Sequence, residues 1–473
     1  MKLLNPRRGP EGKAMKRISL LLALATIGTL KAQTGGSPMG GFGGPAVLGR
    51  GTGSGTGQRG GADLGISFFA GMMATIDSGL TGLRLDPSGS LSSNAGKGVD
   101  GFAGVFGSKR LKRGSVGINY SGHYRQYSGA GSITGTDQSL GLYASRQLSK
   151  RSTLQFSANA MTTNRPFGFS ISGINTDPSA FTLFSPVGEL FDNRIYFSSG
   201  SAEYSVQKSA RLSFSLGGQG FITRRTGKVL FGVNGGAATA SVAYRLTRRQ
   251  TVNVGYQFLT FNFTRNFGDS YGNGAFGGYS IQLGRRAQLG LQGGFYRLES
   301  LGLRTANVDP IIAALIGIST VQEVFHSISI LPTAELSLQY KVSRFHSLGV
   351  SGGITASPGN GVINTSRNTT GGVSYTYSGI RSVGLSAAAY YLKMASLIAG
   401  NQEFSSIQAS GNASRHITEG FYLSLSAGNR KFLNSNTNTF ARNSYFATVG
   451  AVSYTHLRAH ETKANLVCRL LLE

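Results

Sequence analysis

The chain lacks tryptophan, has one cysteine and carries few charges: 14% of its 473 residues are Asp, Glu, Lys or Arg. Because that cysteine is Cys468, no disulfide can form within the chain. No stretch reaches the roughly 18–20 consecutive apolar residues that a membrane-spanning helix needs. These absences exclude a disulfide-stapled domain and a helical membrane protein, and so low a charged fraction is atypical of a water-soluble enzyme.

What the sequence does contain is alternation of apolar and polar residues. Ala240–Phe261 consists of two alternating runs around the turn Thr247–Gln250. In the second run, one face carries Val252, Val254, Tyr256 and Phe258, and the other carries Asn253, Gly255 and Gln257. Since successive side chains of a strand point to opposite faces, this stretch predicts a β-hairpin with one apolar and one polar face.

The hairpin pattern repeats along the chain. Short connections recur about every 38 residues, with two gaps of 59, at Lys112, Lys150, Ser209, Arg248, Arg285, Arg344, Arg381 and Glu419. Each period holds two runs of roughly 10–12 residues, the length of a tilted strand that crosses a bilayer, whereas a propeller blade would need four shorter strands. With one strand before the first pair and one after the last, the count is 18, an even number that can close without a free edge.

The ends of the chain differ in character from this body. Residues 1–32 combine an over-extended start, with Met15 as the better initiator, and a secretory signal whose apolar core is Ile18–Leu30. Residues 33–61 are rich in Gly and Ser and predict a flexible lead-in. Residues 62–451 are the predicted barrel, and 452–473 are a separate tail.

That tail, Val452–Glu473, resembles the translation of a sequencing adapter fused to the reading frame. The alternative is a short amphipathic C-terminal helix. In either case we assign no function to Cys468, His456 or His460.

The alternation of short turns and long loops resembles the outer-membrane β-barrels of Gram-negative bacteria, in the porin-like size class. The resemblance implies an all-β fold: a transmembrane, antiparallel up-and-down β-barrel of about 18 strands with short periplasmic turns and long extracellular loops. By that polarity the long loops are Ala74–Lys97, Thr163–Asn193 and Glu299–Ser329. No motif identifies a particular family.

Positive charge gathers at the short turns. The formal net charge is +27, and a basic rim is expected on the periplasmic side from Lys112, Arg113, Lys150, Arg151, Arg248, Arg249, Arg285, Arg286, Arg344 and Arg381. Such a ring can concentrate anions at a channel mouth. We favour the other interpretation, in which these side chains sit among lipid phosphates and fix the height of the barrel, because basic side chains at a membrane interface are common. Nucleic-acid binding is not expected, because no aromatic residues interleave the basic ones in a groove.

A second candidate site is the loop that begins near Thr305. Asp309 and Pro310 supply an N-cap and a first helical position, and Ile311–Val324, which includes Glu323, predicts a short apolar helix. Folded inward, this segment would be a constriction loop. Folded over the rim, it would cover neighbouring loops.

No catalytic constellation is evident in the sequence. Outside the tail the histidines are His123, His326, His346 and His416; His123 shares a polar strand face with Asn119, Ser121 and Arg125. No paired carboxylates, metal-ligand spacing or nucleotide loop occurs, so neither an enzyme nor a cofactor is expected.

The resulting hypothesis is an exported outer-membrane channel for passive diffusion of small hydrophilic solutes, with a preference for anions. Its expected partners are outer-membrane lipids and the solutes, and the oligomeric state stays open, a homo-oligomer included. The alternative is a non-conducting barrel that acts in surface binding or in polysaccharide export and assembly.

Overall fold

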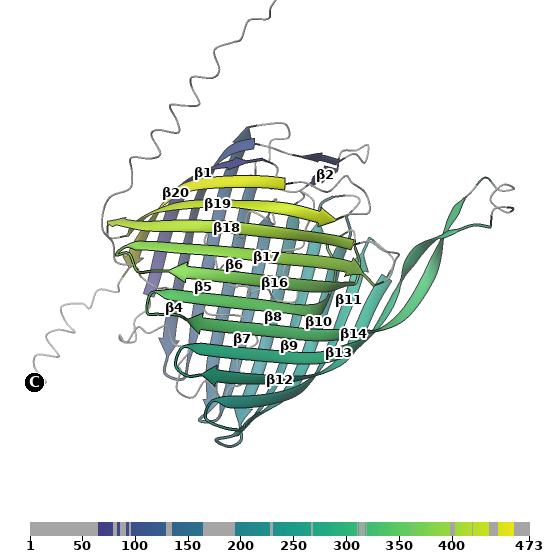
Figure 1. Ribbon diagram of the computed structural model, residues 1–473, viewed down its shortest axis with the longest axis horizontal. Helices are drawn as coiled ribbons and strands as arrows, with labels where there is room; N and C mark the ends of the chain where they lie inside the picture. The colour runs from purple at the N-terminus through teal and green to yellow at the C-terminus, as the bar shows by residue number, and fades with distance from the viewer. Residues whose placement is uncertain are drawn as a thin grey trace, which may run out of the picture.

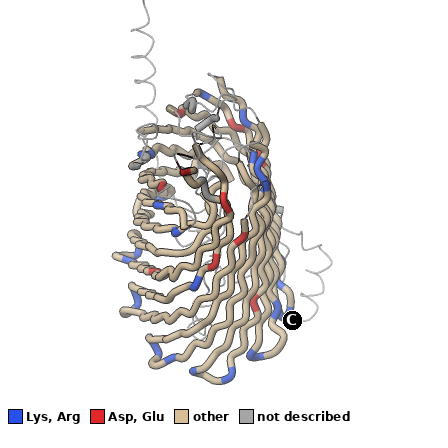
Figure 2. Tube along the Cα trace, turned by 90° about the vertical axis from the view of Figure 1, so that its right-hand side faces the viewer, with Lys and Arg blue, Asp and Glu red and all other residues tan. Residues whose placement is uncertain are grey.

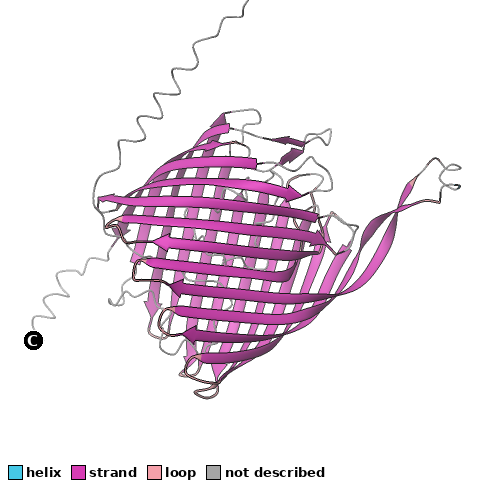
Figure 3. Ribbon diagram, viewed as in Figure 1, coloured by secondary structure: helices cyan, strands magenta, loops and turns pink. Residues whose placement is uncertain are grey.

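The computed structural model describes residues 65–457, with gaps at 79–82, 86–90, 94–95, 129–134, 164–193, 228–229, 266–267, 310, 312–316, 318, 362, 398–402, 419 and 435–442. Strands make up the wall throughout (Figure 3). No helix among the described residues is long and apolar enough to span a bilayer.

Eighteen strands form one closed antiparallel sheet in which each strand pairs with its neighbours in the chain, and β1 closes the ring by pairing with both β4 and β20 (Figure 1). The wall strands are β1 (Gly65–Asp77), β4 (Gly96–Leu111), β5 (Gly114–Ser128), β6 (Gly135–Ser149), β7 (Ser152–Thr163), β8 (Ile195–Gln207), β9 (Leu212–Arg225), β10 (Gly232–Arg245), β11 (Gln250–Thr264), β12 (Gly268–Leu283), β13 (Ala287–Asn307), β14 (Thr320–Lys341), β15 (His346–Ser357), β16 (Ser366–Tyr377), β17 (Val383–Ser396), β18 (Glu403–Thr418), β19 (Phe421–Asn434) and β20 (Asn443–Leu457). The short strands β2 (Leu83–Leu85) and β3 (Leu91–Ser93) form a separate hairpin between β1 and β4.

The predicted fold class and strand count are therefore confirmed, and the eight short connections all lie at one end of the barrel. We call this the short-turn end and the opposite one the loop end. The last strand runs to Leu457, past the expected barrel boundary at Ala451, and pairs there with Ile66 of β1. The first six residues of the predicted tail are thus strand and not helix; residues 458–473 lie outside the described part.

Backbone hydrogen bonds join each short turn to the next. The carbonyl of Arg113 accepts from the N–H of Gln147 at 2.7 Å, and that of Arg151 accepts from Gln207 at 2.7 Å. The same relation continues around the ring to the final bond, from the N–H of Tyr454 to the carbonyl of Gly420 at 2.6 Å. This series of bonds satisfies polar backbone groups beside the turns, where the ladders of the sheet end.

The outer face is apolar and bordered by aromatic side chains at both ends. Exposed aromatics near the short-turn end are Tyr204, Phe214, Tyr244, Tyr340, Tyr375 and Phe421, and those near the loop end are Tyr124, Tyr196, Tyr271 and Tyr445. Exposed aliphatic residues lie between them, among them Ile118, Leu142, Leu216, Val254, Leu291, Val373 and Leu425. An apolar band flanked by two aromatic girdles is the lipid-facing surface of a membrane barrel.

The expectation of a long loop over Glu299–Ser329 is wrong. β13 continues to Asn307 and β14 starts at Thr320, and the two pair with each other up to Asn307↔Thr320. They form a ribbon that projects from the barrel wall (Figure 1). Ser327, Ile328, Ser329 and Ile330 already show the period of two, which the apolar run before them obscures.

Candidate functional site: the barrel lumen

From β5 to β18 the inner face of the wall is mainly polar over its short-turn half. On β19, β20, β1 and β4 the same face carries Tyr422, Tyr454, Phe69 and Phe106, whose rings contact one another. Serines of the polar part meet side by side on neighbouring strands: the hydroxyls of Ser115 and Ser145 lie 3.0 Å apart, and those of Ser215 and Ser241 lie 2.6 Å apart. Gln155, Asn253 and other polar side chains alternate with the lipid-facing residues on these strands. A wall of hydroxyl and amide groups can replace water around a hydrophilic solute, so this half of the lumen suits aqueous passage.

A buried group of charged residues lies inside the wall where β4, β5 and β6 meet. Arg125 Nε donates to Asp100 Oδ2 at 3.1 Å, and its Nη2 lies 2.5 Å from Asp137 Oδ2. His123 Nδ1 is 3.4 Å from the same oxygen of Asp100. Its ring stacks on Phe102 with 5.3 Å between centroids. His123 therefore lies on the polar inner face, as predicted. Its contact with Asp100 makes it part of a buried charged group of the wall.

Two carboxylates are placed on the lumenal face without such partners. Glu203 of β8 shares the inner face with Gln155, and Glu335 of β14 shares it with Gln292. Neither has an ion-pair partner within the described residues. Each therefore places an acidic group on the lumenal face.

The connection between β15 and β16, residues 358–365, folds into the loop end of the barrel; we call it the inner loop. The carbonyl of Gly361 accepts a hydrogen bond from the N–H of Phe231 at 3.2 Å. Phe231 lies between β9 and β10, and β11–β15 separate β10 from β16 around the wall. The inner loop also meets Ser270 on the inner face of β12, where Thr365 Oγ1 is 2.5 Å from Ser270 Oγ. It therefore spans part of the mouth as a chord.

Two glycines give the inner loop its shape. Gly359 and Gly361 have φ of +78° and +93°, a region that side chains disfavour. A Cβ on Gly361 would lie 2.8 Å from Nε of Arg225, whose Nη1 donates to the carbonyl of Phe231 at 2.6 Å. Within the loop the N–H of Ile363 donates to Oδ1 of Asn360 at 3.0 Å. A hydrogen bond within the loop thus stabilises the turn, and the loop packs against the buried guanidinium of Arg225.

Beneath and beside the inner loop, the inner wall is apolar; we call this group the inner cluster. Leu259 is 1% exposed and Phe261 is fully buried, whereas Phe258, on the outer face of the same strand, is 38% exposed. The inner cluster consists of Ile195, Phe197, Phe221, Phe231, Val233, Ala237, Leu259, Phe261, Phe263, Tyr296, Leu298, Leu331 and Ala356. Strand register places the members that lie in wall strands, Ala356 excepted, on the face opposite Phe258, which is the lumenal face. The loop end of the lumen is therefore packed with apolar side chains on one side of the barrel.

The predicted basic residues lie where the turn positions require. Lys112, Arg113, Lys150, Arg151, Arg248, Arg249, Arg285, Arg286, Arg344 and Arg381 all lie exposed in turns at the short-turn end. Figure 2 shows Lys and Arg at the tips of successive turns, with few charges along the wall. Arg151 and Arg286 also donate to the backbone of neighbouring turns, at Lys208 and Val342. The basic residues thus form a ring around the short-turn end, and Arg151 and Arg286 are also held by hydrogen bonds to neighbouring turns.

The expected constriction loop is placed differently. Asp309 follows β13 and accepts the N–H of Ile311 through Oδ1 at 2.9 Å, and Ile311 is 80% exposed. Glu323 lies in β14, so the predicted helix does not extend through Thr320–Val324; Pro310 lies outside the described residues. These residues belong to the projecting ribbon. Among the described residues, it is the inner loop that lies across the mouth.

The sequence carried signals for both features that the prediction missed. The run Ser357-Pro-Gly-Asn-Gly consists of residues that favour turns, and it predicts a tight turn in the connection between β15 and β16. In β11, Leu259, Phe261 and Phe263 continue the face that begins with Asn253 and Gln257. A strand with apolar residues on both faces is shielded from water on both. In a membrane barrel lipid covers the outer face, so apolar residues on the other face predict packing inside the barrel.

No protein-family model matches the chain, and no curated protein matches its sequence. Among solved structures it is similar to OccAB1 of Acinetobacter baumannii (11% identity, TM-score 0.38, covering 84% of this chain and 96% of that one). It is similar to OpdL of Pseudomonas aeruginosa at 12% identity and a TM-score of 0.37, covering 84% and 99% of the two chains. The FrpB iron transporter of Neisseria meningitidis gives 8% identity and a TM-score of 0.41, with 81% of this chain and 65% of FrpB covered.

The assignment of the fold rests on the strand pairing and on the outer surface. A sheet closed without free edges, with an apolar band between two aromatic girdles, is the form in which β-sheets cross outer membranes. The chain is an outer-membrane β-barrel. Over the described residues, no three metal-ligating side chains converge.

Proposed function

We propose that the chain is an outer-membrane channel through which small hydrophilic solutes diffuse, and that the inner loop restricts its mouth. The observation that carries this proposal is the polar inner face of the short-turn half, with its paired serines, inside a closed ring of 18 strands. Barrels of 16–18 strands are wide enough to hold an aqueous passage. The short turns would then face the periplasm and the loop end the exterior.

The selectivity of this channel follows from two opposing sets of charges. The basic ring at the short-turn end attracts anions to that mouth. Glu203 and Glu335 on the wall act against it. We propose a net preference for anions, because the ring has many more charges and lies at an entrance. The basic residues that bond neighbouring turns also keep the ring in place next to lipid phosphates.

Single-channel recording in a planar bilayer tests the proposal. The purified chain should give discrete conductance steps. In a salt gradient, the reversal potential should have the sign expected for a channel that prefers anions. Absence of steps in correctly assembled protein would refute the channel. A reversal potential of the cation sign would refute only the selectivity.

A second function is favoured by one specific observation, the inner cluster. Its side chains and the inner loop fill part of the loop end, which is what a non-conducting barrel for surface binding or polysaccharide export would need at its mouth. Removal of the inner loop separates the two functions. A channel that already conducts gains conductance, whereas a sealed barrel changes from silent to conducting.

A further inference from the structure

The side of β14 that faces β15 loses its partner part-way along the strand. The β14–β15 ladder ends at the pair Ala334↔Ile354, whereas the β13–β14 ladder continues to Asn307↔Thr320. Among the described strands, none pairs with β14 on that side between Thr320 and Thr333. We call this side of β14, over these residues, the open edge. It belongs to the projecting ribbon (Figure 1).

The ladder between β13 and β14 shows which backbone groups point to the open edge. At one end, the N–H of Val308 donates to the carbonyl of Ser319 at 3.0 Å. At the other end, the N–H of Lys341 donates to the carbonyl of Arg286 at 2.7 Å. Since bonded and non-bonded pairs alternate in an antiparallel ladder, odd-numbered residues of β14 bond to β13 and even-numbered ones turn their backbone groups away from it. The N–H groups at the open edge are those of Thr320, Gln322, Val324, His326, Ile328 and Ile330.

The open edge has few of the features that commonly prevent strand pairing. Edge strands are usually protected by charged side chains, by prolines or by bulges. The register of β13 with β14 has no shift, and the single proline of β14, Pro332, lies at the base of the open edge. No residue that turns its backbone to this edge is Lys, Arg, Asp or Glu. Of these residues, Val324, Ile328 and Ile330 have side chains that are 62%, 54% and 75% exposed. The open edge is thus an apolar strand edge that a further strand can join.

Most of the open edge lies outside the hydrocarbon region of the bilayer. On the outer face of β13, Phe295 is 56% exposed, and two residues further towards the loop end Arg297 forms an ion pair with Glu299. A change from aromatic to charged side chains marks the membrane surface. Ile330 pairs with Arg297, so residues 320–329 of β14 lie beyond this level. A second strand can therefore reach them without entering lipid.

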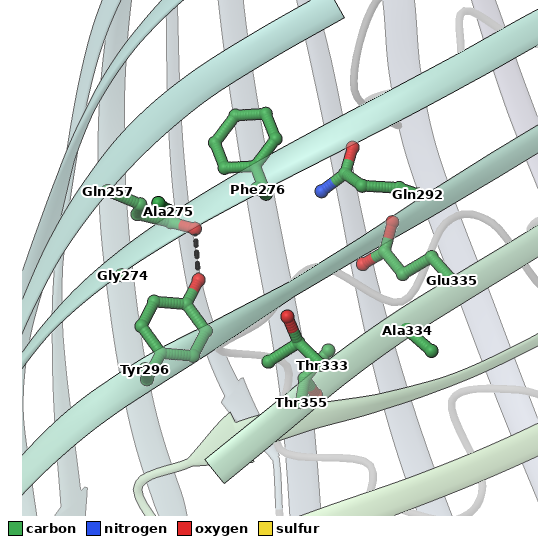
Figure 4. A pocket seen from close by; sticks show the side chains of 10 residues that line it. All are labelled: Gln257, Gly274, Ala275, Phe276, Gln292, Tyr296, Thr333, Ala334, Glu335 and Thr355. Atoms are coloured by element: carbon green, nitrogen blue, oxygen red, sulfur yellow. Dashed lines mark hydrogen bonds between the residues drawn. The ribbon is translucent and has the colours of Figure 1, made fainter. Parts of the chain in front are cut away.

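The base of the ribbon is anchored in the wall. Beside the last β14–β15 pair, Thr333 and Glu335 of β14 and Tyr296 of β13 line a small pocket on the lumenal face (Figure 4). The Tyr296 hydroxyl donates to Oε1 of Gln257. Because Gln257 belongs to β11, this bond reaches across β12 and ties β13 to the wall close to the point where β14 leaves β15. A strand edge that is already held in place loses little conformational freedom when another strand pairs with it.

From these observations we propose that two copies of the chain associate through the open edge. β14 of one copy pairs with β14 of the other, and the two ribbons become one four-stranded sheet beyond the membrane surface. A second copy is the partner because the membrane presents it in the same orientation, with its own open edge at the same height. The edge also lacks Lys and Arg, so the copies meet where their formal charges of +27 repel each other least. This association is separate from conduction and does not depend on it.

Counting subunits in vesicles tests the proposal. A dye on Cys468, the single cysteine, should bleach in two steps in most spots when the chain is reconstituted at high dilution in lipid. Val324→Pro with Ile328→Pro removes two N–H groups from the open edge and keeps the bonds to β13, so its spots should bleach in one step. Mainly one-step bleaching of the unchanged chain, or two-step bleaching of the proline variant, would overturn the proposal.

The control for the proline variant is Val324→Thr with Ile328→Thr. It keeps both N–H groups and the β-branched side chains that suit a strand, so it should bleach in two steps. One-step bleaching of this control would assign the association to apolar side chains and would contradict pairing of the strands.

Disulfide cross-linking tests whether the contact lies on the ribbon. In a Cys468→Ser chain, single cysteines are introduced in turn at positions 324–330 of β14. Oxidation should give a disulfide-linked dimer at one or more of these positions, because paired strands bring facing residues within reach of a disulfide. Asn307→Cys is the control, since it is exposed in the same ribbon but lies on β13, one strand further from the contact. Cross-linking at Asn307→Cys as strong as at the best position of β14, or none on β14, would refute the pairing.

Discussion

Phe231 and Gly361 are joined by a backbone hydrogen bond of 3.2 Å, although β11–β15 lie between their connections around the barrel wall. This bond holds the inner loop across the mouth. Its acceptor, Gly361, has a φ of +93° and no room for a Cβ beside Arg225. The path of the inner loop at this point therefore requires a glycine at position 361.

Gly361→Ala should release the inner loop and raise single-channel conductance. The substitution places a side chain in the left-handed region, at a cost of about 1–2 kcal/mol, and pushes its Cβ against the Arg225 guanidinium. The matched control is Gly371→Ala on the outer face of β16, where a Cβ meets nothing within 4 Å. Unchanged conductance in Gly361→Ala would mean that the inner loop does not limit flow.

Excision of the ribbon tip, residues 303–325, with a two-residue turn in its place should leave conductance unchanged. The pairing of β12 with β13 ends at Gly302, and the pairing of β14 with β15 ends at Ala334, so the tip contributes to no other ladder. Planar-bilayer recording of the shortened chain checks this. A large rise in conductance would show that the tip, like the predicted constriction loop, reaches the pore.

Arg125→Met should lower the free energy of unfolding by about 3–5 kcal/mol, because two buried carboxylates lose their cation. Arg125 lies 3.1 Å from Asp100 and 2.5 Å from Asp137, and all three side chains are nearly inaccessible. Urea unfolding in lipid vesicles measures the loss. The triple variant that adds Asp100→Asn and Asp137→Asn should recover part of it; failure to recover would point to packing and not charge.

Arg248→Gln with Arg249→Gln should move the reversal potential in a salt gradient towards the cation value. Both residues lie in one short turn at the entrance, where positive charge concentrates anions. The control pair, Arg224→Gln with Arg367→Gln, removes the same charge from the outer face of the wall and should leave the potential unchanged. Equal shifts in both pairs would assign the effect to net charge alone.

The barrel could be predicted because its signals are local. A period of two and a short connection are legible within a dozen residues, as at Val252–Phe258 and the turn before it, and strands that follow one another in the chain also pair in the wall. Even the inward direction of His123 follows from its neighbours Ser121 and Arg125.

The mouth could not be predicted in the same way. The bond between Phe231 and Gly361 joins segments that meet only after the ring has closed, and no local pattern encodes it. The apolar sequence after Asp309 favours a helix when taken alone, so it does not predict the ribbon. From Thr320 onward the chain is a strand because it pairs with β13. Tertiary pairing outweighs local preference there.

The central claim is that alternate residues of each strand face lipid and water. Its most direct test is single-cysteine labelling along β9 in a Cys468→Ser chain reconstituted into vesicles, with a membrane-impermeant thiol reagent. Ser215→Cys and Gly217→Cys, two half-buried positions on the inner face, should label rapidly, and Phe214→Cys and Leu216→Cys should label slowly or not at all. Equal labelling of all four positions would contradict a barrel with a water-filled interior and a lipid-facing wall.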